Sequence, residues 1–357
     1  MRIGLIAPPW LPVPPPRYGG TEGVIDRLAR GLRAAGQEVV LFTTGDATCP
    51  VPRAWVLEAS APERLGEALV EQRHVVHAYA ALEHCDIVHD HTTVGPFHAE
   101  RYPGLPVVVT NHGPFTDEAR DVYRAIALRA GVIAISHHQA AAAGDVPIAA
   151  VIHHGIDVPL TGPEAAVGDY LLFLGRMAPE KGAHLAAHAA REAGASLKIA
   201  ARMRAPAEVE YFTTEVAPLL GGDIEFVGEV GGNEKLALLA GARALVNPIR
   251  WPEPFGLVMI EALAHGTPVL SLAEGAAPEI VTDGVTGWLC EDVAGLVAAI
   301  DRIDALDRGA CRAAAVAHFS TELMVAAHLE LYTRRCAARP AGTVIDLRGS
   351  SATPSAG

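Results

Sequence analysis

Cysteine and charged side chains are both scarce in this sequence of 357 residues. The five cysteines are odd in number and widely spread, and no Cys-x-x-Cys pair occurs among them. A disulfide framework or a zinc module needs paired or closely spaced cysteines, so the sequence predicts free thiols. Charged residues make up 19% and hydrophobic residues 50%, a composition that excludes an intrinsically disordered chain.

Positive charge is in particularly short supply. The chain has 28 Lys and Arg against 41 Asp and Glu, a net charge of −13. This balance disfavours nucleic acid and anionic lipid as partners. No apolar run reaches the roughly 18 residues of a membrane span, and the stretch Met1–Trp10 is too short for a signal peptide. We therefore expect a cytoplasmic protein with at most peripheral membrane contact.

Two motifs of nucleotide-binding proteins are missing. The sequence has neither Gly-x-Gly-x-x-Gly nor Gly-x-x-x-x-Gly-Lys-Ser/Thr, so neither a dinucleotide fingerprint nor a Walker loop is expected. Sixteen histidines include the pairs His137-His138 and His153-His154, but no ligand spacing of a known metal motif. We predict no metal site.

What is present is a regular alternation of short apolar runs with stretches of helical spacing. Apolar runs without in-and-out alternation are typical of strands buried on both faces of a parallel sheet. The length exceeds what one hydrophobic core usually serves. The sequence thus predicts an α/β protein with two doubly wound, Rossmann-like domains. The runs expected to form strands are 1–7, 39–43, 86–89, 106–110, 131–136, 149–153, 170–174, 196–200, 224–227, 244–246 and 269–271.

A polar stretch without periodicity, 157–169, predicts the linker between the domains. We expect an N-terminal domain over 1–160, a C-terminal domain over 161–317, and a last helix over 318–338. The remaining stretch, 339–357, is unpatterned and contains Ser, Pro and Gly, which predicts a disordered tail.

The strongest local signal is a pair of glutamates, Glu253 and Glu261, on either side of an expected helix start at Pro254. Free N–H groups at a helix N-terminus favour a phosphate, and an ionised carboxylate among apolar neighbours needs partners such as ligand hydroxyls. The residues expected to offer N–H groups are Phe255, Gly256, Leu257 and Val258.

Cations and glycines follow other expected strands. Arg176 and Lys181 come directly after the run 170–174, at a strand end where open α/β sheets bind ligands, and two cations there suit a diphosphate. Gly19-Gly20 precedes the first helix and lets the backbone approach a charged ligand. His112 also follows a strand, a position that is more often structural than functional.

Together these residues resemble the retaining glycosyltransferases of family 4, which have the GT-B fold. The paired glutamates, Gly266-Thr-Pro-Val and the stretch Glu279–Gly287 are specific to that resemblance, which extends to about Arg335. The resemblance implies that the N-terminal domain binds the acceptor and the C-terminal domain binds a nucleotide sugar. It also implies that the last helix crosses back onto the N-terminal domain.

The resemblance further assigns roles to single residues. Glu253 is expected to bind donor-sugar hydroxyls, and Glu261 the ribose. The diphosphate is expected to be bound by Arg176, Lys181 and the amides of Gly19 and Gly20. His112 is expected near the donor sugar, and the turn containing Val227 at the base. His154 stands where the family usually has asparagine.

The resemblance implies transfer of a hexose or N-acetylhexosamine, with retention of configuration and without a metal or other cofactor. A UDP-sugar is the expected donor. The loops 10–18 and 114–124 are expected to read the acceptor, a small molecule, a glycan or a lipid-linked sugar, with a soluble acceptor favoured. Two alternatives stay open: a nucleotide-sugar epimerase or phosphorylase of the same fold, and a non-catalytic nucleotide-sugar-binding protein.

Overall fold

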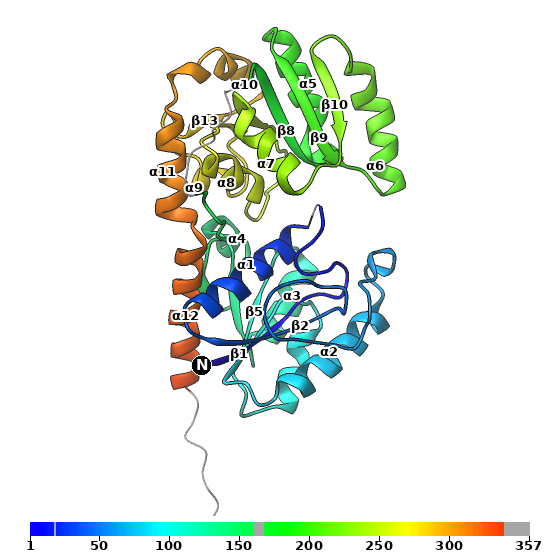
Figure 1. The fold of residues 1–357 in the computed structure, drawn as a ribbon, viewed down its shortest axis with the longest axis vertical. Coiled ribbons are helices and arrows are strands. Elements are labelled where there is room, and N and C mark those ends of the chain that lie inside the picture. Colours follow the sequence, from blue (N-terminus) through cyan, green and yellow to red (C-terminus); the bar gives the residue numbers. More distant parts are fainter. Residues whose placement is uncertain (18, 160–167, 339–357) are drawn as a thin grey trace, which may run out of the picture.

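The computed structural model describes residues 1–17, 19–159 and 168–338. Two α/β lobes lie one above the other, each built around its own parallel sheet (Figure 1). The sequence prediction of two doubly wound, parallel-sheet lobes is therefore confirmed. Most of the expected linker and the whole expected tail, 339–357, lie outside the described residues.

The N-terminal lobe contains a seven-stranded sheet in the order β3-β2-β1-β4-β5-β6-β7. All neighbouring strands are parallel, and the interior strand β1 pairs Leu5 with Leu41 of β2 on one side and with His89 of β4 on the other. Every residue of β4, β5 and β6 is buried, as expected for strands covered on both faces. The strands are β1 (Arg2–Ile6), β2 (Glu38–Thr43), β3 (Arg53–Trp55), β4 (Ile87–Asp90), β5 (Val107–Thr110), β6 (Gly131–Ala134) and β7 (Ile148–Val151).

Helices cover both faces of this sheet (Figure 1). Helix α1 buries Val24, Ile25, Leu28 and Leu32, whose spacing places them on one side of the helix. This apolar stripe packs into the core beside Leu5 and the other residues of the sheet's inner face. The helices of the lobe are α1 (Gly20–Ala34), α2 (Ala68–Leu82), α3 (Asp117–Ile126) and α4 (His137–Ala142).

The C-terminal lobe contains a six-stranded parallel sheet in the order β10-β9-β8-β11-β12-β13. Its strands are β8 (Tyr170–Arg176), β9 (Ser196–Arg202), β10 (Ile224–Gly228), β11 (Ala244–Asn247), β12 (Val269–Leu272) and β13 (Gly287–Cys290). Its helices are α5 (Ala183–Glu192), α6 (Pro206–Tyr211), α7 (Gly232–Gly241), α8 (Leu257–Ala264), α9 (Ala277–Ile280), α10 (Val293–Ile300) and α11 (Arg308–Phe319).

Two edge strands, β3 and β13, were not predicted from the sequence. Both strands are short. The two end residues of β13 are buried and its two middle residues are half-buried, so β13 lacks the continuous buried run of the central strands. Gly287 starts β13 with its backbone pressed against β12: an added Cβ would lie 1.9 Å from the carbonyl oxygen of Val269. The strand therefore depends on a close backbone approach that a hydrophobicity pattern does not show.

The last helix, α12 (Thr321–Ala337), returns to the N-terminal lobe and runs along its side (Figure 1). It packs against α1 closely enough that a Cβ on Gly31 would lie 2.5 Å from Cγ2 of Val325. The predicted start at His318 is wrong, because His318 and Phe319 belong to α11. Ser320 separates the two helices. Its Oγ accepts a hydrogen bond from the N–H of Leu323 at 3.3 Å, which caps the N-terminus of α12.

Candidate functional site

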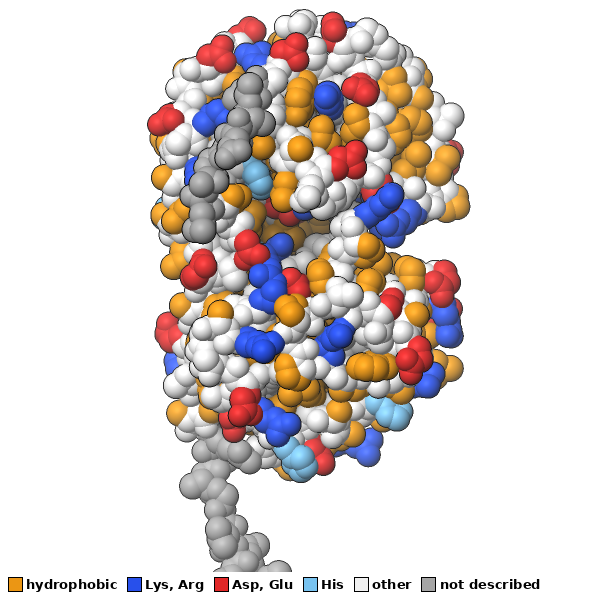
Figure 2. All heavy atoms as spheres, in the orientation of Figure 1, with side chains coloured by type: hydrophobic (Ala, Val, Ile, Leu, Met, Phe, Trp, Pro, Cys, Tyr) orange, Lys and Arg blue, Asp and Glu red, His pale blue; other side chains and the backbone are white. Residues whose placement is uncertain are grey.

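A pocket of about 420 Å³ lies between the lobes, where Figure 2 shows the surface hollowed. We call it the smaller pocket. It is reached by the carboxyl ends of β8 and β11 and by the N-termini of α1 and α8. The predicted site residues that line it are Gly19, Gly20, His112, Arg176, Lys181, Glu253, Phe255, Gly256, Leu257, Val258 and Glu261. Residues from both halves of the chain therefore share one pocket.

Val227 is the predicted site residue that the structure does not bring to this pocket. It lies on β10, half-buried against the core of the C-terminal lobe. Val230, in the loop that follows β10, lines the pocket instead.

Helix α8 begins later than the sequence predicts. Its first residue is Leu257, and Gly256 is the N-cap with a φ of 101°, so Pro254 lies in the preceding loop. A Cβ on Gly256 would lie 2.4 Å from Cε of Met259, the far end of a flexible side chain, so the positive φ is the reason that this position favours glycine. The first turn of α8 offers the N–H groups of Leu257 and Val258, and those of Phe255 and Gly256 belong to the loop and the N-cap before it.

The N-termini of α1 and α8 meet across the smaller pocket. A Cβ on Gly20, the first residue of α1, would lie 3.2 Å from Cδ1 of Leu257, the first residue of α8. Both helix ends carry partial positive charge and unbonded N–H groups, which together suit a multiply charged anion.

Carboxylates pair with both predicted cations of the smaller pocket. Lys181 donates from Nζ to Glu253, and both side chains are largely buried, at 15% and 16% exposure. Arg176 donates to Glu180. The sequence predicted that Lys181 and Glu253 share one site, but not that they pair with one another.

Lys235 is a site residue that the sequence analysis missed. It lies on α7 and lines the smaller pocket, where its Nζ is 2.8 Å from Oε1 of Glu261. One signal for it exists: Lys235 follows Gly231-Gly232 in the loop and helix start after β10, much as Lys181 follows β8. The ion pair gives the Glu261 carboxylate, whose side chain is only 14% exposed, a partner of opposite charge.

His112 lies in a cluster of buried histidines. Its Nε2 is 2.9 Å from Nδ1 of His91, and its ring stacks on that of His154 with centroids 5.3 Å apart. Burial lowers the pKa of His112 to about 4, with a further contribution from His328, so the ring is neutral at physiological pH. A neutral ring can form one hydrogen bond, as donor or as acceptor, with an uncharged partner such as a sugar hydroxyl.

A second cavity, which we call the larger cavity, has a volume of about 910 Å³ and shares Thr21 and His112 with the smaller pocket. Both loops expected to read the acceptor contribute to its wall, through Trp10 and Leu11 and through Tyr123. Glu22 also lines it, and burial raises the pKa of Glu22 to about 7 against the opposing hydrogen bond of its own backbone.

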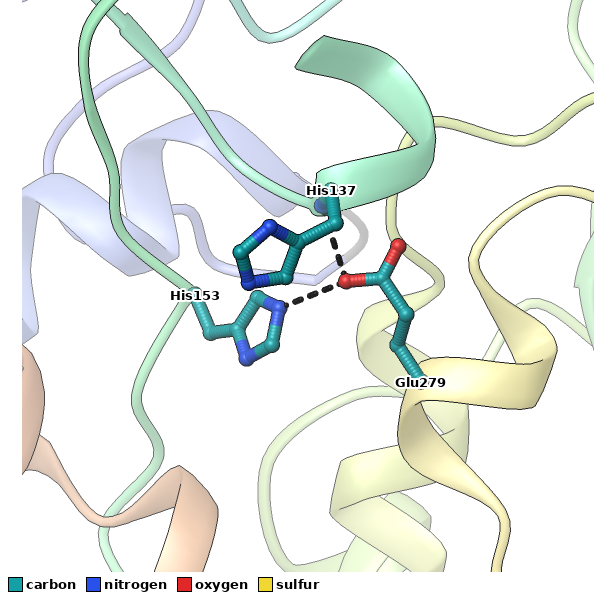
Figure 3. Close-up of side chains that lie close together, drawn as sticks. All are labelled: His137, His153 and Glu279. Carbon is teal, nitrogen blue, oxygen red and sulfur yellow. Dashed lines mark hydrogen bonds and ion pairs between the residues drawn. The ribbon is translucent and has the colours of Figure 1, made fainter. Parts of the chain in front are cut away.

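One group of described residues has the donor types and spacing to hold a metal ion: His137, His153 and Glu279 (Figure 3). The Glu279 carboxylate already accepts hydrogen bonds from the N–H of His137 at 2.8 Å, from the N–H of His138 at 2.6 Å and from Nε2 of His153 at 2.9 Å. Burial opposes ionisation of Glu279, but these hydrogen bonds outweigh it and lower its pKa. The carboxylate therefore joins α9 of one lobe to α4 and the end of β7 in the other.

Comparison with known proteins gives matches over both lobes. Residues 18–159 match the family model described as Glycosyltransferase Family 4, and residues 168–304 match the one described as Glycosyl transferases group 1. A phosphatidyl-myo-inositol mannosyltransferase of Mycolicibacterium smegmatis is 29% identical over 356 residues, which cover 90% of this chain and 88% of that protein. A glycogen synthase of Mycobacterium tuberculosis is 36% identical over 167 residues, 42% of this chain, and the match spans 38% of the synthase.

A solved structure of a glycosyltransferase involved in avilamycin A biosynthesis superposes with a TM-score of 0.71. It is 28% identical, and the match covers 94% of this chain and 98% of that one. Within the described part of the chain, no helix has the length and apolar character needed to cross a bilayer. The two family models and the shared two-lobed fold show that the chain belongs to the family 4 glycosyltransferases with the GT-B fold.

Proposed function

We propose that the protein transfers a hexose or N-acetylhexosamine from a nucleoside diphosphate sugar, with UDP as the expected nucleotide, to a hydroxyl of an acceptor. In this proposal the reaction keeps the anomeric configuration and needs no metal. The observation that carries it is the smaller pocket, where two helix N-termini and the cations Arg176 and Lys181 converge between the lobes. The larger cavity beside it would hold the acceptor.

Donor binding would replace the ion pairs of the smaller pocket. The diphosphate takes over Lys181, together with the N–H groups of Leu257 and Gly20, and Glu253 becomes free to accept hydrogen bonds from sugar hydroxyls. In the same way, Glu261 turns from Lys235 to the ribose hydroxyls. Each half-buried carboxylate thus exchanges one partner for another, which avoids leaving an unpaired charge in a dry site.

The base would contact the loop that follows β10. Val230 lines the smaller pocket whereas Val227 does not, so we now place the base beside Val230. A contact between the base and the backbone of this loop fits uracil, guanine or adenine. Comparison of UDP-, GDP- and ADP-linked sugars tests the preference for UDP.

The chemical step follows from electrostatics. As the bond from the anomeric carbon to the diphosphate oxygen breaks, negative charge grows on the diphosphate, and Arg176, Lys181 and the helix N–H groups stabilise that charge. The acceptor oxygen forms its bond to the anomeric carbon from the same face, and its proton passes to an oxygen of the departing phosphate. The products are the glycoside and the protonated nucleoside diphosphate, and no protein base is required.

His112 would position the sugar rather than transfer a proton. It lines both cavities, and its low pKa keeps it neutral, so it can hydrogen-bond a hydroxyl of the donor sugar without adding charge. A positively charged ring there would disfavour the oxocarbenium character that develops at the anomeric carbon.

The test is nucleotide release from UDP-, GDP- and ADP-linked sugars, measured with and without a pool of hydroxyl acceptors and in the presence of EDTA. A transferase releases nucleoside diphosphate in an acceptor-dependent way. Inversion of one sugar carbon of the nucleotide sugar without any acceptor, with or without release of nucleotide, identifies the epimerase alternative. Tight donor binding with neither release nor inversion identifies the non-catalytic alternative.

A further inference from the structure

The larger cavity, about 910 Å³, has a polar floor built for groups that both donate and accept hydrogen bonds. His91 and Asn111 line it and are more than nine-tenths buried. Within the described part of the chain, Nε2 of His91 and Nδ2 of Asn111 have no hydrogen-bond partner. Neither atom is exposed to the cavity in this arrangement, but leaving a buried polar atom without a partner is costly, so a small turn of the side chain that brings the atom to a bound hydroxyl is favoured.

Glu22 adds a carboxyl group to the same floor. It is buried on the first turn of α1 and faces the larger cavity, and no cation among the described residues forms an ion pair with it. Its pKa of about 7 allows it to donate or to accept a hydrogen bond near neutral pH. An amide, an imidazole and such a carboxyl group together match neighbouring hydroxyls, each of which also donates and accepts.

The charges around the larger cavity disfavour a phosphorylated acceptor. Arg202 donates to Glu208 at 3.2 Å, so its charge is already compensated. Arg204 is paired with Glu229 at 2.7 Å. Both arginines come from the C-terminal lobe. The charged residues that line the cavity are Glu22, Glu63, Glu71, Arg202 and Arg204, so carboxyl groups outnumber guanidinium groups.

An apolar wall leads from this floor to the solvent. Trp10, Leu11 and Pro62 form part of it, and Leu65 lines the cavity while 69% of its surface stays exposed, which places it at the mouth. A large aliphatic side chain this exposed at the mouth of a cavity favours contact with an apolar part of a ligand.

We propose that the acceptor is an uncharged amphiphile: a hydroxylated ring held by Glu22, His91 and Asn111, carrying an apolar group that leaves along Leu65. This inference rests on the proposed function, because it takes the larger cavity as the acceptor site. It narrows the acceptor from any hydroxyl compound to glycosides with an apolar aglycone and excludes sugar phosphates.

The experiment measures binding to the full chain by calorimetry, with UDP present at saturation. The probes are the hexyl glycosides of glucose, galactose and mannose, each against its free sugar and its 6-phosphate. At least one hexyl glycoside is expected to bind roughly tenfold or more tightly than its free sugar, since several methylenes leave water along the wall. The 6-phosphates are expected to bind more weakly than the free sugars.

Two variants locate the effect. Leu65→Ser is expected to remove most of the advantage of the hexyl group. Leu128→Ser is the matched control, because Leu128 is 80% exposed but lines neither cavity, and it should leave the advantage intact. Equal loss in both variants would mean that the hexyl group binds elsewhere and would overturn the proposal.

The remaining outcomes separate this inference from the proposed function. If UDP binds but a 6-phosphate equals or exceeds its hexyl glycoside, or none of the probes binds, the acceptor inference is wrong and donor binding stands. If no nucleotide binds and no nucleotide sugar is turned over, the proposed function fails, whatever the order of the sugars.

Discussion

Replacing Glu253 by glutamine should tighten the binding of free nucleoside diphosphate while it slows sugar transfer. In the structure without donor, the Glu253 carboxylate is bound to Nζ of Lys181, and both side chains are largely buried. The diphosphate therefore competes with Glu253 for the charge of Lys181. Glutamine keeps the size of the side chain but removes the competing charge.

The magnitude follows from Coulomb's law. Two unit charges about 4 Å apart interact by about 4 kcal/mol at an effective dielectric constant of about 20. Lys181 and Glu253 are each about one-sixth exposed, at 15% and 16%, and solvent reduces the effect. A quarter of that interaction, about 1 kcal/mol, would tighten the binding of free UDP by about fivefold. The whole nucleotide sugar should not gain, because it loses a charged hydrogen bond to its sugar, worth about 1.5 to 3 kcal/mol.

Calorimetry with UDP gives the affinity, and steady-state transfer gives kcat. The matched control is Glu100→Gln, which removes one negative charge from an exposed site that lines neither cavity. If Glu253→Gln binds UDP more weakly than the wild type, or no more tightly than Glu100→Gln does, then Lys181 does not reach the diphosphate. In that event the exchange of ion-pair partners proposed for the smaller pocket is wrong.

Four further outcomes are expected. Arg176→Ala and Lys181→Ala should each lower kcat by roughly 10²–10³, the scale for one lost donor to developing charge, whereas Arg129→Ala on the surface should not. Glu261→Gln should weaken free UDP by about 1.5 to 3 kcal/mol in calorimetry. Transfer rates should be the same with and without EDTA, and loss of turnover restored by Mg²⁺ or Mn²⁺ would contradict this. Because the pKa of Glu279 is lowered in the folded protein, its ionised carboxylate stabilises the fold fully above the unfolded pKa of about 4.3, and this stabilisation is lost as the pH falls through the folded pKa. Glu279→Gln should therefore lower Tm at pH 7 and make Tm less dependent on pH in the acid range.

The sequence was sufficient for the fold because buried parallel strands leave a strong pattern. All eleven apolar runs that were predicted as strands correspond to strands in the structure. Short edge strands leave a weaker pattern, which is why β3 and β13 were missed. The start of α8 was misplaced because proline is typical of a first turn, whereas here the positive φ of Gly256 sets the boundary.

The sequence predicted which residues lie around the smaller pocket, but not which of them pair with one another. Strand ends and helix N-termini share one edge of each lobe, so local motifs were enough to bring Arg176, Lys181 and Glu261 to one pocket. The partners of those groups depend on how distant segments pack. The pairing of Lys235 with Glu261 and the joining of the lobes by Glu279 arise from such packing, and no local spacing in the sequence reveals them.

The ion pairs of the smaller pocket also determine how its variants should be interpreted. Lys181 and Glu253 are each held in a largely buried position by the other, and so are Lys235 and Glu261, at 27% and 14% exposure. Removing one member leaves the other as an unpaired charge, which costs more than removing both. A single substitution therefore combines the loss of a ligand contact with the cost of that unpaired charge. The double variant Lys181→Met with Glu253→Gln removes the second contribution, so comparing its Tm with those of the two single variants separates stability from donor recognition.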